Sequence, residues 1–121
     1  MPEFYVKGWY KEGNVQVSFE GKLTYEPEEY MIHGIVEDRW GKSTLLGFFH
    51  KADKEFDPRI YQCLRLIKLY HPHTAGAGGI WLSFWKEGTD LKGVWEGKWV
   101  FGNSFPEKHE GVETRIELAP V

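Results

Sequence analysis

The segment that decides the fold class is Val15-Gln-Val-Ser-Phe-Glu-Gly-Lys-Leu-Thr-Tyr25. Apolar residues and one glycine occupy its odd positions, whereas its even positions are all polar or charged. This alternation is typical of a β-strand with one face in a core and the other in water. The same pattern recurs over residues 91–101 and 112–118. The sequence therefore predicts an all-β domain built from antiparallel strands.

Further segments have the length and apolar content of strands, and short turn sequences separate them. The turns include Glu12-Gly13-Asn14 and Asp38-Arg39-Trp40-Gly41. The additional predicted strands cover residues 4–10, 30–37, 43–50, 60–70 and 79–86. About eight strands at hairpin spacing predict a sandwich or a barrel.

Residues 57–70 also permit a helix. Asp57-Pro58 is a good helix start, because Asp caps the first turn and proline fits the first helical position. From Leu64 to Tyr70, however, every second residue shares a face as in a strand, and an isolated helix would interrupt a run of hairpins. We predict a strand for residues 60–70, with the helix as the alternative.

Glycines within good strands favour a closed barrel over a sandwich. A strand glycine usually costs stability, but a closed eight-stranded sheet must bend sharply, and inward glycines permit the bend beneath neighbouring aromatic rings. The glycines concerned are Gly21, Gly34, Gly47, Gly93 and Gly97.

Two stretches resemble the calycin-type barrels, which include avidin-like, lipocalin and fatty-acid-binding proteins. They are the hairpin Gly34-Ile-Val-Glu-Asp38-Arg-Trp-Gly41-Lys-Ser-Thr-Leu-Leu-Gly47 and the strand Gly93-x-Trp95-x-Gly97. Lipocalins place Gly-x-Trp on their first strand, where this chain has Gly8-Trp9. The resemblance implies an eight-stranded antiparallel up-and-down barrel over residues 1–121, an internal cavity and no particular ligand.

Composition excludes several function classes. The 15 Lys and Arg and the 18 Asp and Glu residues are interspersed, so we expect no nucleic-acid partner, which would need a basic stripe. Cys63, the single cysteine, excludes an internal disulfide and fits a reducing compartment. The start lacks a secretory signal, and the longest apolar stretches fall far short of the ~20 residues that span a bilayer. We expect a cytoplasmic protein without membrane insertion.

Two local patterns raise the question of a metal. His71-Pro72-His73 opens a glycine-rich stretch up to residue 79, which we interpret as a rim loop. Two histidines are too few for zinc, and Asp53-Lys-Glu-Phe-Asp57 lacks the glycine and terminal Glu of a calcium loop. We predict no metal and no cofactor.

Six tryptophans exceed what a core of this size requires. Trp81 and Trp85 share one strand face, as do Trp95 and Trp99, and aromatic walls with a few polar groups form small-molecule pockets. Arg65 and Lys68 lie on opposite faces of a leucine-rich strand. At least one of the two side chains is therefore expected to point inward or towards a partner. Such a charge must be paired, with Glu20 or Glu96 as counterions, unless it extends to solvent.

The sequence contains no Gly-x-Ser-x-Gly, phosphate-loop or dinucleotide motif. Our leading hypothesis is a barrel that binds a small, largely apolar or aromatic molecule in an aromatic interior cavity, with a mobile loop from His71 to Gly79 at its mouth. The alternatives are a protein-interaction or oligomerisation module, including a homodimer, and a small lyase or isomerase that uses His71 or His73 with a Glu. The candidate ligand-binding residues are Arg65, Lys68, Tyr70, His71, His73, Trp81, Trp85, Trp95 and Trp99.

Overall fold

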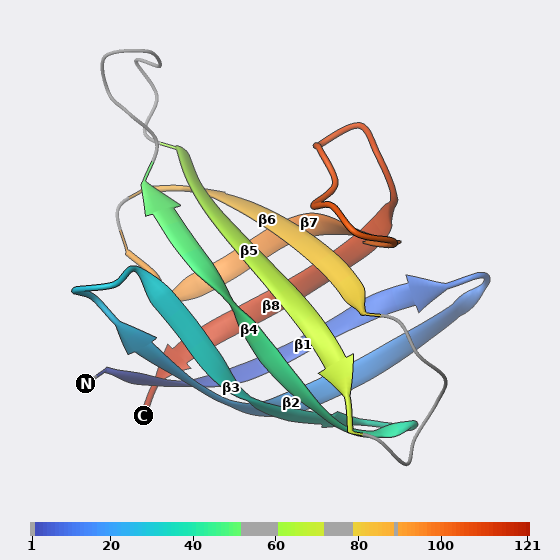
Figure 1. The fold of residues 1–121 in the computed structure, drawn as a ribbon, viewed down its shortest axis with the longest axis horizontal. Coiled ribbons are helices and arrows are strands. Elements are labelled where there is room, and N and C mark those ends of the chain that lie inside the picture. The colour runs from blue at the N-terminus through green and yellow to red at the C-terminus, as the bar shows by residue number, and fades with distance from the viewer. Residues whose placement is uncertain (1, 52–60, 72–78, 89) are drawn as a thin grey trace.

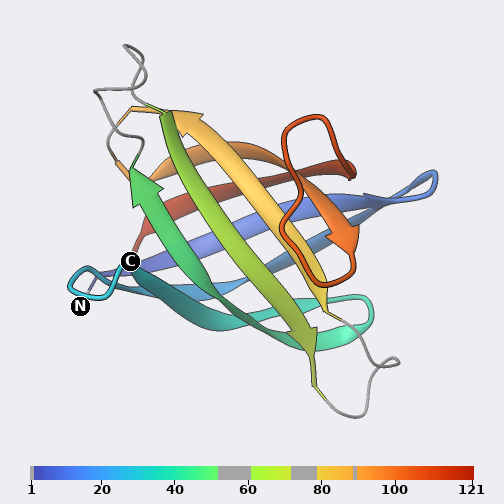
Figure 2. The same cartoon turned by 45° about the horizontal axis from the view of Figure 1, so that its top comes forward.

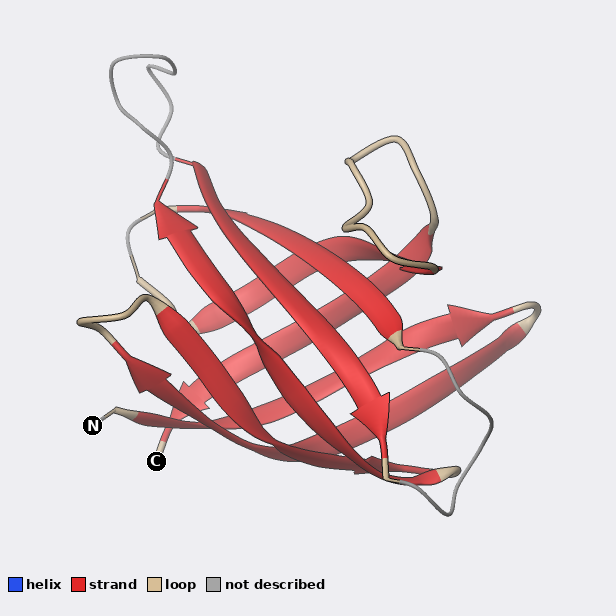
Figure 3. Cartoon of the chain, viewed as in Figure 1, coloured by secondary structure: helices blue, strands red, loops and turns tan. Residues whose placement is uncertain are grey.

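The computed structural model describes residues 2–51, 61–71, 79–88 and 90–121. These residues form eight β-strands and no helix (Figure 3), as predicted. The strands are β1 (Glu3–Glu12), β2 (Val15–Glu26), β3 (Met31–Asp38), β4 (Gly41–Lys51), β5 (Tyr61–Tyr70), β6 (Ile80–Glu87), β7 (Gly93–Phe101) and β8 (Val112–Pro120).

Pairing between the first and last strands closes the sheet. Each strand is antiparallel to its neighbours in sequence, and β1 also pairs with β8, with Tyr10 opposite Thr114 (Figure 1). The two ends of the chain therefore lie together, and the Val121 N–H donates to the carbonyl of Glu3 at 3.0 Å. The fold is the predicted up-and-down barrel, in which every strand is paired on both sides.

Residues 61–70 form β5, so the helix alternative is wrong. The strand joins β4 to β6, with Leu66 opposite Gly47 on one side and Leu82 on the other. A helix here would leave the facing backbone groups of β4 and β6 without partners, which is costly inside a sheet. Barrel closure thus outweighs the helix-start signal of Asp57-Pro58, which lies outside the described residues.

The inward side chains of the described strands pack into one core. The apolar residues of this core are at most 7% exposed. Aromatic rings pack edge to face within it: Phe49 against Trp95, with ring centroids 6.1 Å apart, and Tyr10 against Trp99, at 5.7 Å. A barrel of eight strands is just wide enough for such side chains.

Inward glycines lie where neighbouring strands approach most closely. A Cβ added at Gly47 would run into the backbone carbonyl of Arg65 on β5. Gly21, Gly34 and Gly97 meet the backbone of an adjacent strand in the same way. Gly93 differs, because its φ of 116° is what requires glycine. Four of the five strand glycines therefore lie where two strand backbones come close, and the predicted bend beneath aromatic rings stays a prediction.

Replacing Gly47 by alanine tests this close approach. We expect Gly47→Ala to lower the free energy of unfolding by about 3 kcal/mol, because the strands must separate to admit a methyl group. Chemical denaturation would measure the change. The matched control is Leu46→Ala on the outer face, which we expect to cost less than about 1 kcal/mol. A Gly47→Ala protein as stable as the parent would contradict the close strand contact.

Candidate functional site

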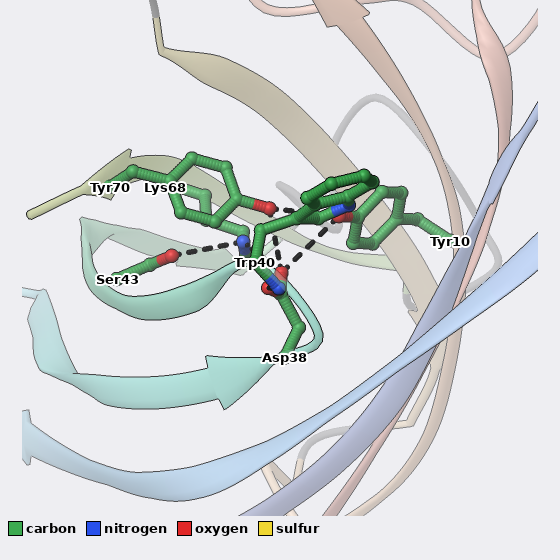
Figure 4. Close-up of polar contacts among 6 residues, drawn as sticks. All are labelled: Tyr10, Asp38, Trp40, Ser43, Lys68 and Tyr70. Carbon is green, nitrogen blue, oxygen red and sulfur yellow. Dashed lines mark hydrogen bonds and ion pairs between the residues drawn. The ribbon is translucent and has the colours of Figure 1, made fainter. Parts of the chain in front are cut away.

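A buried ion pair lies inside one end of the barrel (Figure 4). Lys68 points inward because it is in phase with Leu64 and Leu66 on β5, and its side chain is 0% exposed. Its Nζ atom lies 2.6 Å from Asp38 Oδ2 and 2.9 Å from Ser43 Oγ. The counterion is therefore Asp38, at the end of β3, and the expectation of Glu20 or Glu96 was wrong. Both glutamates are exposed, because they occupy outward positions of β2 and β7.

Two phenols and one backbone amide complete the coordination of Asp38. The Tyr70 hydroxyl donates to Asp38 Oδ2 at 2.6 Å, and the Tyr10 hydroxyl lies 3.2 Å from the same oxygen and 2.8 Å from the Tyr70 oxygen. The Trp40 N–H donates to Asp38 Oδ1 at 2.8 Å. We call Tyr10, Asp38, Ser43, Lys68 and Tyr70 the Lys68–Asp38 cluster; it connects β1, β3, β4 and β5 (Figure 4).

Burial and hydrogen bonding shift the pKa values of the cluster. Burial alone would raise the pKa of Asp38, but the hydrogen bonds from Lys68, Tyr70 and the Trp40 amide outweigh it and lower that pKa. Burial lowers the pKa of Lys68, and the contact with Asp38 partly offsets this. Burial and the neighbouring carboxylate raise the pKa of Tyr70, which stays a neutral donor. The cluster is an ionised pair solvated by phenols in place of water.

The hydrogen bonds of the cluster link four strands of the barrel to one another. A buried ion pair gains little net stability, but loss of one partner leaves the other charge buried and uncompensated. Lys68 and Asp38 are both fully enclosed and already hydrogen-bonded to protein groups. The described contacts thus hold the β3–β4 hairpin onto β5 and β1.

The inward tryptophans among the candidates also have partners. Trp95 Nε1 donates to the Leu91 carbonyl and Trp99 Nε1 to the Lys11 carbonyl, each at 2.8 Å. Both rings are at most 5% exposed. They fill the core, and their polar atoms are satisfied within it.

Other candidate residues lie on the outer surface or outside the described residues. Arg65, Trp81 and Trp85 occupy outward positions of β5 and β6. His71 follows β5, with Nε2 3.3 Å from Thr44 Oγ1. His73 falls outside the described residues, as do Asp53, Glu55 and Asp57. Among the predicted residues in the described strands, Lys68, Tyr70, Trp95 and Trp99 thus lie on the inner face of the sheet, whereas Arg65, Trp81 and Trp85 lie on the outer face.

The connection between β7 and β8 covers part of this outer surface. Figure 2 shows the connection beside β6. The Phe105 ring lies 4.8 Å from that of Trp81, the Arg65 guanidinium is 5.7 Å from Phe105, and Arg65 reaches Glu107 at 3.7 Å. Lys108 Nζ lies 5.6 Å from the Trp85 ring centroid. The β7–β8 loop therefore packs on the outer surface of the barrel through Phe105, Glu107 and Lys108.

Next to the β7–β8 loop, the outer surface has a groove of about 620 Å³. The strand register places Trp85, Glu96, Arg115 and Trp9 directly opposite one another across β6, β7, β8 and β1. We call these four residues the Trp85–Trp9 row. The groove is lined by Trp9, Trp85, Lys86, Glu87, Val94, Glu96, Gly97, Lys98, Lys108, Glu113, Thr114 and Arg115.

The central charges of the row do not neutralise each other by direct contact. Within the described residues, neither Glu96 nor Arg115 takes part in an ion pair or a side-chain hydrogen bond. Both side chains are exposed, and an indole lies on each side of them. Sequence reasoning considered Glu96 only as a counterion and missed Arg115, although strand alternation places both on the outer face with Trp85 and Trp9.

Two other outer features are less suited to a site. A second hollow of about 540 Å³ runs between β1, β2 and β3, and its one aromatic residue, Tyr5, already lies 5.3 Å from Lys22 Nζ. The second feature is the outer face of β3 to β5, which exposes the apolar side chains of Ile35, Leu46, Phe48 and Leu69.

These exposed side chains do not test whether two copies of the chain associate, so the homodimer suggested by the sequence stays a prediction.

The described residues contain no group of three or more His, Cys, Asp or Glu side chains that could hold a metal. They also form no helix long and apolar enough to cross a membrane. No protein-family model, curated protein or solved structure matches the chain significantly.

The coupling between Lys68 and Asp38 is testable by a double-mutant cycle. We expect Lys68→Met to lower the free energy of unfolding by about 3 kcal/mol, because it strands a buried carboxylate. Adding Asp38→Asn should recover part of that loss. Urea unfolding of the two single variants and the double variant would measure it, with exposed Lys42→Met as the control. Strictly additive losses would contradict an ion pair.

Because folding lowers the pKa of Asp38, the free energy of unfolding depends on pH in the acid range. Its carboxylate contributes stability that is present above its unfolded pKa of about 4 and is lost as pH falls through the lower folded value. We therefore expect the free energy of unfolding to decline below pH of about 4, and Asp38→Asn to show a shallower decline. Urea unfolding at several pH values would measure both slopes. Equal slopes for the two proteins would refute the assignment.

Proposed function

We propose that this protein is a small-molecule-binding barrel whose binding site is the outer groove between Trp85 and Trp9. A volume of about 620 Å³ lies within the ~300–1,000 Å³ range of ligand pockets. Its two half-buried indoles supply the aromatic surface of a ligand site, and polar groups between them can fix the orientation of a ligand. The observation that carries the proposal is the Trp85–Trp9 row, whose carboxylate and guanidinium form no ion pair with any described residue.

The described interior is a poorer host than the groove. Calycin-type barrels hold ligands inside, but here inward aromatic rings occupy that space and their N–H groups are bonded to backbone carbonyls. A ligand reaching Lys68 would have to break its contacts with Asp38 and Ser43. A ligand in the outer groove need not break such a pair, because Glu96 and Arg115 form no ion pair or side-chain hydrogen bond within the described residues.

The six tryptophans allow the two locations to be distinguished. In ¹⁵N-labelled protein each indole N–H gives its own NMR signal, and these signals can be followed against a library of water-soluble fragments. We expect binding fragments to shift the Trp9 and Trp85 signals and to leave those of the inward Trp95 and Trp99 in place.

Substitutions supply the controls for this experiment. Trp9→Ala should abolish the shift at Trp85, whereas Trp40→Ala removes an exposed indole outside the groove and should leave binding unchanged. Fragments that move Trp95 or Trp99 alone would refute the outer site in favour of an interior one. A library without any binder at Trp9 and Trp85 would refute the proposed function.

A further inference from the structure

We propose that the groove binds a neutral oligosaccharide, an inference that rests on the proposed function and adds the class of ligand. The groove combines two indoles, a floor with both hydrogen-bond donors and acceptors, a lining of mixed charge and strands whose backbones are already paired on both sides. Each of these four features restricts the chemistry of the ligand.

The indoles favour a ligand with apolar ring faces. Trp85 and Trp9 stand three strands apart, which corresponds to roughly 14 Å of sheet at ~4.8 Å per strand. An indole offers a large rigid apolar face with one polar N–H, and sugar rings present C–H faces that stack on such surfaces. Lys108 contacts Trp85, but an exposed cation–π contact is weak enough to be exchanged for a ring. Two indoles at this separation suit a chain of several linked rings.

The floor between the indoles favours hydroxyl groups. Glu96 accepts hydrogen bonds only, whereas Arg115 donates only. A hydroxyl can do both, so vicinal hydroxyls can donate to Glu96 and accept from Arg115 at the same time. Thr114 and Gly97 also line the groove between these side chains. A purely apolar ligand would bury the two charges without compensation, which is costly.

The charge of the lining favours a neutral ligand. Four lining residues are cationic, namely Lys86, Lys98, Lys108 and Arg115, and three are anionic, namely Glu87, Glu96 and Glu113. Lys98 and Glu113 face each other across β7 and β8, as Glu96 and Arg115 do. The lining therefore offers no single-sign field that would select an anion such as a phosphate, or a cation.

The sheet surface also argues against an extended peptide. A peptide in this position would gain affinity chiefly by adding a strand to an exposed sheet edge. In this barrel β6, β7, β8 and β1 are each paired on both sides, so their backbones are already used. A ligand in the groove must be recognised by side chains, as rings and hydroxyls are.

A panel of defined ligands tests the inference. Cellotetraose, maltotetraose, chitotetraose and mannotetraose would be titrated into the intact protein, followed by the indole NMR signals and calorimetry. The comparison ligands are the corresponding monosaccharides, a sulfated tetrasaccharide and an uncharged tetrapeptide. We expect at least one neutral tetrasaccharide to shift Trp9 and Trp85 and to bind at least tenfold more tightly than its monosaccharide.

Variants distinguish stacking from hydrogen bonding. Trp9→Ala should weaken tetrasaccharide binding about tenfold, Trp9→Phe should retain part of it, and Glu96→Gln should weaken it severalfold. Trp40→Ala is the matched control and should bind as the parent does. Thermal unfolding of each variant would establish that it is folded.

The outcomes separate this inference from the proposed function. If fragments, the tetrapeptide or the sulfated sugar shift Trp9 and Trp85 but no neutral tetrasaccharide does, the oligosaccharide inference is overturned and the groove remains a binding site. If nothing shifts these signals, both fail. Tetrasaccharide binding that is unaffected by Trp9→Ala would also overturn the inference, because the sugar would then lie elsewhere.

Discussion

The pairing of β1 with β8 is the constraint on which the rest of this structure depends. It converts a meander of hairpins into a closed surface, so that alternate residues of every strand are committed to the inside or the outside. With eight strands the enclosed space is only about as wide as the side chains that fill it. Rings such as those of Phe49, Trp95 and Trp99 occupy that space. The binding site that we propose accordingly lies on the outer surface.

The Lys68–Asp38 cluster shows what closure demands of a polar group placed inside. A charge without water must be solvated by the protein, and here two phenols, a hydroxyl and a backbone amide perform that task. The result is a specific connection between four strands at one end of the barrel. The outer Glu96 and Arg115 face the opposite condition, because both are exposed and neither forms an ion pair with another described residue.

Sequence alternation predicted the all-β barrel correctly, and the inward glycines distinguished it from a sandwich, because both signals are local consequences of strand geometry. The alternation of inward and outward residues also held information about the ion pair that the sequence analysis did not use. Asp38 is in phase with the inward Val36, and Lys68 with the inward Leu66, so their pairing across the barrel was accessible once the register was known. Asp38 was interpreted only as a turn residue. The groove could not be predicted, because it depends on which residues of β6, β7, β8 and β1 come opposite one another, and register between strands is set by the whole closed sheet.

We propose that side chains fill the described interior of the barrel and that a ligand binds on its outer surface. Xenon enters dry apolar cavities and is visible in diffraction data. A crystal of the protein held under xenon pressure should show no xenon among the inward rings of Phe49, Trp95 and Trp99. A xenon atom bound among these rings would reveal an internal cavity and contradict the claim.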